Sequence, residues 1–304
     1  MDTVKSLEGI YSEEPSVLTI GKFDGLHRGH MELVRRMDGS SLKKIVFSLC
    51  ISPTTLLTLK EKAAALEDAG VDLDIECPFT PEVITMEPED FVEEILVRRL
   101  KAKKLVVGAD FRFGSGRRGS IALLNEMGGR LGFAVEAVEK LQHSGGDIST
   151  SRIKAALSEG LVEEANEMLG YRYFITGQVL KGRRIGRTLG FPTVNLVPEK
   201  EKFLPKNGVY YSGAFVGNDY FQAVTDIGTK PTVGGGFAGV ETHLFGASGD
   251  MYGRDQKIEL LAFERPEMKF GSLEALKERI ALDKENAAKW HAEHGGRLRT
   301  EALC

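Results

Sequence analysis

Residues 21–30, GKFDGLHRGH, combine glycines with two histidines that lie three positions apart, His27 and His30. Glycines let a backbone pass close to a ligand, and a helix that starts here would offer unpaired N–H groups to an anion. Imidazoles can donate hydrogen bonds to the charge that grows on a leaving pyrophosphate. The segment therefore predicts a phosphate site. For this motif taken alone, a glycine-rich turn with incidental histidines is the alternative.

A second segment of this kind, GQVLKGRRIGRTLGFPTVN, spans residues 177–195. Its glycines permit close backbone approach to phosphates, and its lysine and arginines supply positive potential. Thr193 and Asn195 are two positions apart, so on an extended chain they project to the same side. A hydroxyl and an amide oxygen on one side suit a hard cation such as Mg2+, which also keeps water and substrate phosphate oxygens. The segment predicts a metal-assisted phosphate site, and a generic basic surface loop is the alternative.

The N-terminal half alternates short apolar runs with helical patterns. VLTIG (17–21), KKIVFSL (43–49) and KLVVG (104–108) are typical of strands, whereas PEDFVEEILVRRL is typical of an amphipathic helix that begins at Pro88. Strands separated by helices favour βαβ crossovers and a mostly parallel sheet. We expect an α/β fold here, with GKFDGLHRGH directly after its first strand.

From about residue 172 the pattern changes to short strand-like segments such as FITGQVL and GVYYSGAFV, separated by turn residues. They predict an antiparallel β-barrel or sandwich. A long amphipathic helix is expected from Ser272 to about Trp290. The predicted domains are residues 1–170 and 171–304, with the boundary near Gly170.

The composition excludes several classes of protein. Hydrophobic residues make up 42% and charged residues 28% of the chain, and the formal net charge is -4, which gives no sign of a nucleic-acid or membrane partner. The N-terminus lacks the basic start and apolar run of a signal peptide. The three cysteines, Cys50, Cys77 and Cys304, are widely spaced, which argues against a disulfide framework and a zinc site. We expect a cytoplasmic protein.

GKFDGLHRGH resembles the signature of the bacterial FAD synthetase family, a branch of the HxGH nucleotidyltransferases. VVGADFRFGSGRRG (106–119) and DISTSRIKAAL (147–157) resemble two further segments of that family in the same order. The resemblance implies a Rossmann-like domain that adenylylates FMN, with His27 and His30 as catalytic residues. It also implies flavin contacts at Asp110, Phe111 and Arg112. The ATP and phosphate contacts that it implies are Gly21, Phe23, Asp24, Gly25, Gly29, Ser149, Thr150, Arg152 and Lys154.

Two departures from that family bear on the adenylyltransferase activity. Lys154 stands where the family motif has arginine, so the planar fork that grips phosphate at two points is missing. FSLCISP (47–53) stands where the family carries a TFxPHP-like segment, which resembles part of the flavin-side wall. These departures favour an alternative, a monofunctional riboflavin kinase with an inert N-terminal domain.

The C-terminal half resembles the riboflavin kinase family from its PTxN core to the end of the chain. NGVYYSG, DIGTKPTVGG, VETHLF and the closing MYGRDQKIELLAFERPEMKFGSLEALKERIALD match successive family segments. The resemblance implies an antiparallel kinase barrel with a terminal helix, in which Glu241 of VETHLF is the general base. It places Thr193 and Asn195 at Mg2+, and Arg265 and Glu267 near the flavin. The phosphate contacts that it implies are Gly182, Arg187, Gly190 and Pro192.

Together the two resemblances predict a bifunctional enzyme. Riboflavin and ATP would give FMN and ADP in the barrel, and FMN and ATP would give FAD and pyrophosphate in the parallel-sheet domain. ATP is a co-substrate of both steps, Mg2+ is the expected metal, and the expected assembly is a monomer or a weak homo-oligomer. A regulator that senses flavins is a further alternative, although sensing would not require a general base.

Overall fold

The computed structural model describes residues 1–50, 52–78, 80–179, 193–230, 237–247, 251 and 253–294. Its contacts divide the chain into two compact units, Met1–Thr150 and Ser151–Leu303. Helices α6 (Thr150–Glu159) and α7 (Val162–Leu169) therefore fall with the second unit, apart from the first residue of α6. The domain boundary expected near Gly170, at the end of α7, stays a prediction.

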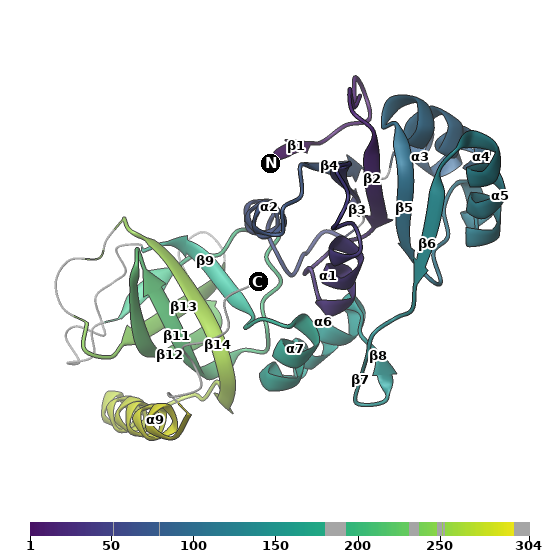
Figure 1. Cartoon of the computed structure of the whole chain (residues 1–304). Helices are drawn as coiled ribbons and strands as arrows, with labels where there is room; N and C mark the ends of the chain where they lie inside the picture. The colour runs from purple at the N-terminus through teal and green to yellow at the C-terminus, as the bar shows by residue number, and fades with distance from the viewer. Residues whose placement is uncertain are drawn as a thin grey trace. The chain divides into compact units, whose positions relative to one another are not determined.

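The first unit is built on a six-stranded sheet in the order β1-β4-β3-β2-β5-β6, in which every neighbouring pair is parallel (Figure 1). This confirms the parallel α/β sheet expected from the sequence. A short hairpin of β7 (Gln142–His143) and β8 (Gly146–Asp147) follows it. The six strands are β1 (Asp2–Val4), β2 (Ser16–Gly21), β3 (Lys43–Cys50), β4 (Leu73–Pro78), β5 (Ala102–Gly108) and β6 (Ala134–Val138).

Two helices of this unit, α2 and α5, show clear capping residues. Helix α2 begins after Thr58, whose side chain accepts from the Glu61 N–H while the Glu61 carboxylate accepts from the Thr58 N–H, a capping box. Helix α5 ends at Gly132, which adopts the left-handed conformation that favours glycine. The helices are α1 (Arg28–Arg35), α2 (Leu59–Asp68), α3 (Pro81–Thr85), α4 (Pro88–Asp90), the π-helix η1 (Phe91–Arg99), the 3-10 turn η2 (Ser115–Arg117) and α5 (Ile121–Leu131).

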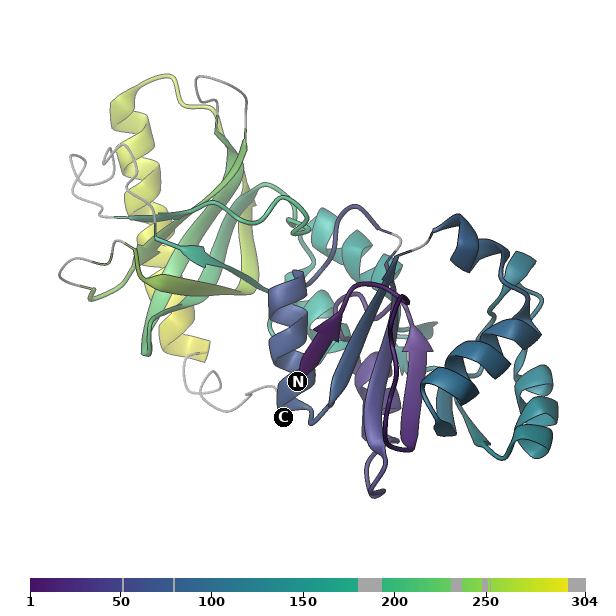
Figure 2. The same ribbon diagram turned by 90° about the horizontal axis from the view of Figure 1, so that it is seen from above.

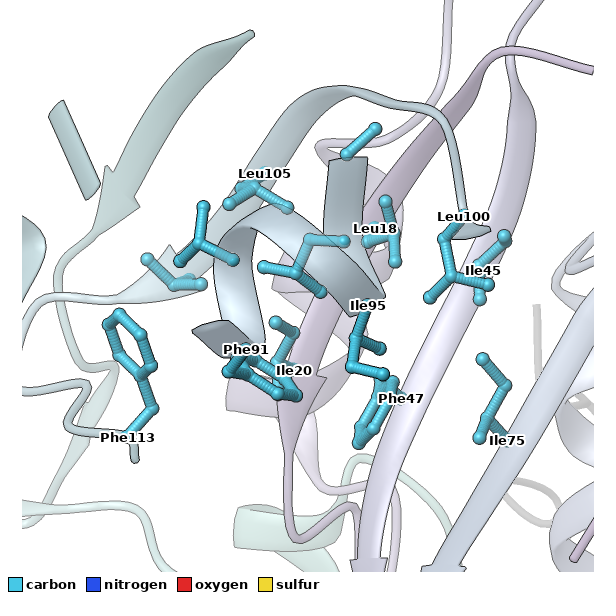
Figure 3. Packing of buried hydrophobic residues seen from close by; sticks show 14 of the residues in the cluster. Leu18, Ile20, Ile45, Phe47, Ile75, Phe91, Ile95, Leu100, Leu105 and Phe113 are labelled. Atoms are coloured by element: carbon cyan, nitrogen blue, oxygen red, sulfur yellow. The ribbon is translucent and has the colours of Figure 1, made fainter. Parts of the chain in front are cut away.

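One face of the sheet carries the main hydrophobic core (Figure 3). Ile20, Ile45 and Phe47 from neighbouring strands pack with Phe91 and Ile95 of η1. Burying each such side chain contributes roughly 1.5–3 kcal/mol. The helix predicted from Pro88 is present, but from Phe91 its backbone winds as a π-helix, and the Leu100 N–H still donates to the Ile95 carbonyl five residues back, at 3.0 Å.

The second unit is a six-stranded antiparallel sheet in the order β10-β13-β12-β11-β14-β9. Its two edge strands approach each other, because a Cβ built on Gly177 of β9 would lie 2.9 Å from the Leu196 side chain of β10. The sheet is therefore nearly closed, which confirms the predicted antiparallel barrel. Its strands are β9 (Phe174–Gln178), β10 (Val194–Leu196), β11 (Gly208–Val216), β12 (Asp219–Lys230), β13 (Phe237–Leu244) and β14 (Asp255–Pro266).

Helix α9 (Leu273–His294) runs along the strands of this barrel (Figure 2). Ala287 of this helix packs against Val209 and Val224. Arg265 of β14 donates from Nε to Oδ1 of Asp283, also on the helix, at 3.0 Å. The helix predicted from Ser272 is confirmed, and it extends four residues beyond Trp290. Over the residues that the structure describes, no helix combines the length and apolar character needed to cross a bilayer.

Candidate active sites

The GKFDGLHRGH segment forms a tight turn between β2, which ends at Gly21, and α1, which begins at Arg28. Phe23 and Leu26 have φ values of 38° and 40°, a left-handed conformation that side chains other than glycine rarely adopt. His27 is the N-cap of α1, and its Nδ1 accepts from the His30 N–H at 3.3 Å. Backbone strain of this kind concentrates at functional sites. The turn places both histidines at the first turn of the helix, as predicted.

His27 and His30 stack on each other, with ring centroids 3.7 Å apart and ring planes inclined by 16°. Phe23 contacts His30 from the other side, at 4.9 Å between centroids. Burial lowers the pKa of His27 to about 4 and holds the pKa of His30 well below its usual range, so both rings are neutral at neutral pH. Because Nδ1 of His27 accepts a hydrogen bond, its proton lies on Nε2, which is then a donor.

The His30 ring carries a polar atom whose role nothing in its surroundings explains. His30 as a whole is half-buried, whereas its Nδ1 is fully buried and has no hydrogen-bond partner among the described residues. Buried polar atoms are normally paired, so an unpaired one at a candidate site fits a group that meets its partner only when substrate binds.

Two glycines and an aspartate of the turn are fixed by close packing. Gly25 has φ 85°, and a Cβ on it would lie 2.5 Å from Leu56. Asp24 accepts a hydrogen bond from the Leu56 N–H at 2.6 Å, and a Cβ on Gly29 would lie 3.2 Å from the His27 ring. Asp24, Gly25 and Gly29 therefore have clear structural roles in shaping the turn, and their predicted ATP contacts stay predictions.

The Thr150 hydroxyl of the DISTSRIK segment donates to the Asp24 carbonyl of this turn at 2.9 Å. Ser149, next to it, is half-buried. The basic residues of the motif lie on α6, in the second unit. Arg152 pairs with Glu164 at 3.0 Å, and the Lys154 ammonium lies over the Phe203 ring at 5.5 Å.

The third predicted segment, GADFRFG, follows β5, which pairs directly with β2. The two glycine-containing turns after β2 and β5 therefore lie at the same carboxyl edge of the sheet, where open α/β sheets bind ligands. Asp110 is exposed and pairs with Lys140 at 2.8 Å. Phe111 stacks on Phe113 with 5.5 Å between centroids, and Arg112 is exposed. The structure thus brings this segment to the same edge of the sheet as the GKFDGLHRGH turn.

In the barrel, Thr193, Asn195 and Glu241 come together from segments distant in the sequence. The Thr193 hydroxyl donates to the Glu241 carboxylate at 2.6 Å, and Asn195 is the register partner of Glu241 across β10 and β13. Hydroxyl, amide and carboxylate oxygens in one place fit a hard cation such as Mg2+. Within the described part of the chain, no group of three or more His, Cys, Asp or Glu that could hold a metal is found.

Four predicted phosphate contacts of the kinase, Gly182, Arg187, Gly190 and Pro192, lie outside the described residues. The two residues expected near the flavin form hydrogen bonds with other residues of the second unit. Arg265 is bound to Asp283 of α9, and Glu267 accepts from the Asn207 side chain at 3.2 Å. Their flavin contacts remain predictions.

Sequence reasoning missed Asp226, which the register places directly opposite Glu241 on β12 and β13. Arg265 pairs with Val209, and Val209 pairs with Asp226, so one row across four strands runs from Arg265 to Glu241 and ends at Asn195 on a fifth. The segment DIG that carries Asp226 was visible in the sequence, but only the strand register shows which residue it faces.

Two family models match this chain, one in each half. The family described as FAD synthetase matches residues 10–152, and the family described as riboflavin kinase matches residues 169–291. A bifunctional riboflavin kinase/FMN adenylyltransferase of Escherichia coli (strain K12) is 34% identical, over 94% of this chain and 98% of that protein. Its counterpart in Pseudomonas fluorescens is also 34% identical, over 93% of this chain and 96% of that protein.

Among solved structures, a crystal structure named as a macrolide-efflux protein of Streptococcus pneumoniae has a TM-score of 0.85 and 27% sequence identity, and the match covers 95% of this chain and 99% of that one. This structural match includes residues of both units, and the two sequence relatives are also matched over nearly the whole chain. The chain belongs to the bifunctional riboflavin kinase/FMN adenylyltransferase family.

Proposed function

We propose that this chain phosphorylates riboflavin to FMN in its C-terminal unit and adenylylates FMN to FAD in its N-terminal unit, with ATP as co-substrate of both steps. The observation that carries the proposal is that each unit holds a site of its own. The barrel brings Glu241 against Thr193 and beside Asn195, and the parallel sheet presents the stacked His27 and His30.

In the kinase step, the Glu241 carboxylate takes the proton of the 5′-hydroxyl of riboflavin as that oxygen bonds to the γ-phosphorus of ATP and the bond to ADP breaks. The Thr193 hydroxyl holds one carboxylate oxygen in place. Thr193 and Asn195 would hold Mg2+, which when bound neutralises phosphate charge. The basic segment 181–187 supplies further positive potential to the phosphates.

In the adenylylation step, a phosphate oxygen of FMN bonds to the α-phosphorus of ATP, and the bond from that phosphorus to the pyrophosphate oxygen breaks. No protein nucleophile is needed, so positioning and charge stabilisation provide the catalysis. The Nε2–H of His27 and the His30 ring are neutral donors for the negative charge that moves onto pyrophosphate. The N-terminal end of the α1 dipole, which begins at this turn, acts in the same direction.

The remaining features of the proposal are the metal, the cellular location, the oligomeric state and the binding partners. Mg2+ is the metal, because the donors gathered around Glu241 are all oxygens. The protein is cytoplasmic and acts as a monomer or a weak homo-oligomer on riboflavin, FMN and ATP, with no nucleic-acid or membrane partner. The net charge of -4 supports this set of partners.

A single incubation tests the proposal. The purified chain is mixed with riboflavin, ATP and Mg2+, and FMN and FAD are separated by chromatography over time. We expect FMN to appear first and FAD to follow. FMN without FAD, even when FMN and ATP are supplied at saturating concentrations, would leave only the kinase.

A further inference from the structure

A cluster of charged side chains is buried between α2 and the sheet of the N-terminal unit, and the mechanism above does not use it. Lys62 of α2 contacts Ser48 of β3 and both Asp74 and Glu76 of β4. The Lys62 ammonium donates to the Ser48 hydroxyl at 2.6 Å, pairs closely with Glu76, and lies 3.6 Å from Asp74. The four residues are between 0% and 5% exposed.

Such a cluster is costly to the fold. It holds one ammonium and two carboxylates away from water, and apolar side chains of similar volume would generally serve stability as well or better. The pKa of Asp74 is raised, chiefly by burial and further by Glu76, while Lys62 opposes the rise. Burying these charges opposes folding, and ionisable groups with perturbed pKa values cluster at functional sites. The cluster is therefore a candidate for a role at a nearby site.

The cluster is joined to the histidine turn through Ser48, and the segment before α2 is joined to it separately. Ser48 is the register partner of Gly21, the residue at which the turn begins. A Cβ on Gly21 would lie 3.2 Å from the Phe23 ring, which in turn contacts His30. The segment that leads into α2 is tied to the same turn, because the Leu56 N–H donates to Asp24. Lys62 therefore fixes α2 to β3 and β4 at the point where the turn leaves the sheet.

The positive charge of Lys62 also lowers the pKa of His30. After burial, the two groups that depress the pKa of His30 are His27, stacked on it from the turn, and Lys62 from α2. The carboxylates of Asp74 and Glu76, from β4, face Lys62, and Asp24 of the turn is held by Leu56. An ammonium beside an imidazole disfavours the imidazolium, so Lys62 helps to keep His30 neutral.

We propose that Lys62 is a positioning residue for FMN adenylylation, which anchors the turn of residues 21–30, and with it His30, through Ser48 and α2. The proposal rests on the proposed adenylyltransferase function for its activity readout. It adds a residue that touches no reacting atom and acts through His30.

The test compares Lys62→Met, Lys62→Arg and wild type in the full-length chain. The ring signals of His30 are followed by NMR from pH 8 down to the pH at which the protein unfolds and are assigned with His30→Gln. We expect the His30 inflection to move to higher pH in Lys62→Met, because a positive charge that lowers the His30 pKa is removed. In Lys62→Arg, which keeps the charge, the inflection should stay close to that of wild type.

Turnover provides the second readout. The kcat for FMN adenylylation should fall at least about tenfold in Lys62→Met, because small misplacements of catalytic groups can cost up to about 100-fold. Riboflavin phosphorylation by the same molecules should stay at the wild-type rate. Lys44→Met is the matched control, since Lys44 is also ion-paired in this unit, to Asp38, but lies outside the cluster.

Each outcome decides the proposal. A folded Lys62→Met protein with an unmoved His30 titration and wild-type FAD formation would overturn it. If Lys62→Met fails to fold, the same measurements are made on Lys62→Met/Asp74→Asn/Glu76→Gln, which leaves no buried charge unpaired. If wild type makes no FAD, the proposed function fails, and the His30 titration still decides whether Lys62 acts on that ring.

Discussion

Thr193 and Glu241 are 48 residues apart in the chain, yet the Thr193 hydroxyl donates to the Glu241 carboxylate across 2.6 Å. A short hydrogen bond to a carboxylate orients it. The orientation matters for a base, because a proton can be taken only within hydrogen-bond reach of a positioned substrate.

Glu241→Gln should abolish most FMN formation while riboflavin and ATP still bind. The amide keeps the size of the side chain but cannot accept the proton, and losing a positioned base typically costs about 100- to 10,000-fold in rate. Kinase turnover and ligand binding by calorimetry are the measurements. Turnover within a few-fold of wild type would remove Glu241 from the role of base, and adenylylation of supplied FMN serves as the control.

Replacing the hydroxyl of Thr193 should weaken the Mg2+-dependent kinase and leave adenylylation of FMN unchanged. Thr193→Val keeps the shape and removes the oxygen, whereas Thr193→Ser keeps the oxygen and serves as the matched control. We expect a higher Mg2+ requirement and a kcat lowered by at least about tenfold for valine, since both a metal ligand and the anchor of a base are lost. Equal loss of both activities in Thr193→Val would contradict the assignment of two separate sites.

His30→Ala should stop FAD formation and spare the kinase. Removing one preorganised donor to charge that develops in the transition state typically costs about 100- to 1,000-fold in rate. The measurement is pyrophosphate release from FMN and ATP, with riboflavin phosphorylation by the same preparation as the control. A wild type that makes FAD, together with an unimpaired His30→Ala variant, would show that His30 is not catalytic.

The stability of α1 should fall as the pH drops from about 6.5 towards 4. Burial lowers the pKa of His27 in the folded protein to about 4, from about 6.5 for an unperturbed histidine. Between these values the unfolded chain binds a proton that the folded chain does not, so acid favours unfolding, by up to about 3 kcal/mol for a shift of this size. Below the folded pKa both states are protonated, and the loss levels off.

Hydrogen exchange of the α1 amides, converted to opening free energies at each pH, measures this effect. His27→Asn is the matched control, because asparagine can still cap the helix but does not titrate. The difference between wild type and His27→Asn should change across this pH window. A constant difference would mean that the buried His27 does not control the stability of the helix.

Much of this protein could be predicted from local sequence. The βαβ periodicity indicated a parallel sheet, and the later run of short strands indicated an antiparallel barrel; the structure confirms both. GKFDGLHRGH lies at the start of α1 as expected, because glycines, capping residues and helical periodicity act within a few residues of each other. The helix from Pro88 was also expected, but its π-helical winding was not, because the i→i+5 pattern depends on how η1 packs on the sheet.

Contacts between distant segments were decided only by the tertiary structure. The sequence determined which residues could do chemistry, since side-chain type and local spacing are written in it. It did not determine that Asp226 faces Glu241, or that Lys62 meets Asp74 and Glu76. Shifting a strand by one residue turns each of its side chains to the opposite face, so such partners follow from register and packing across the whole unit.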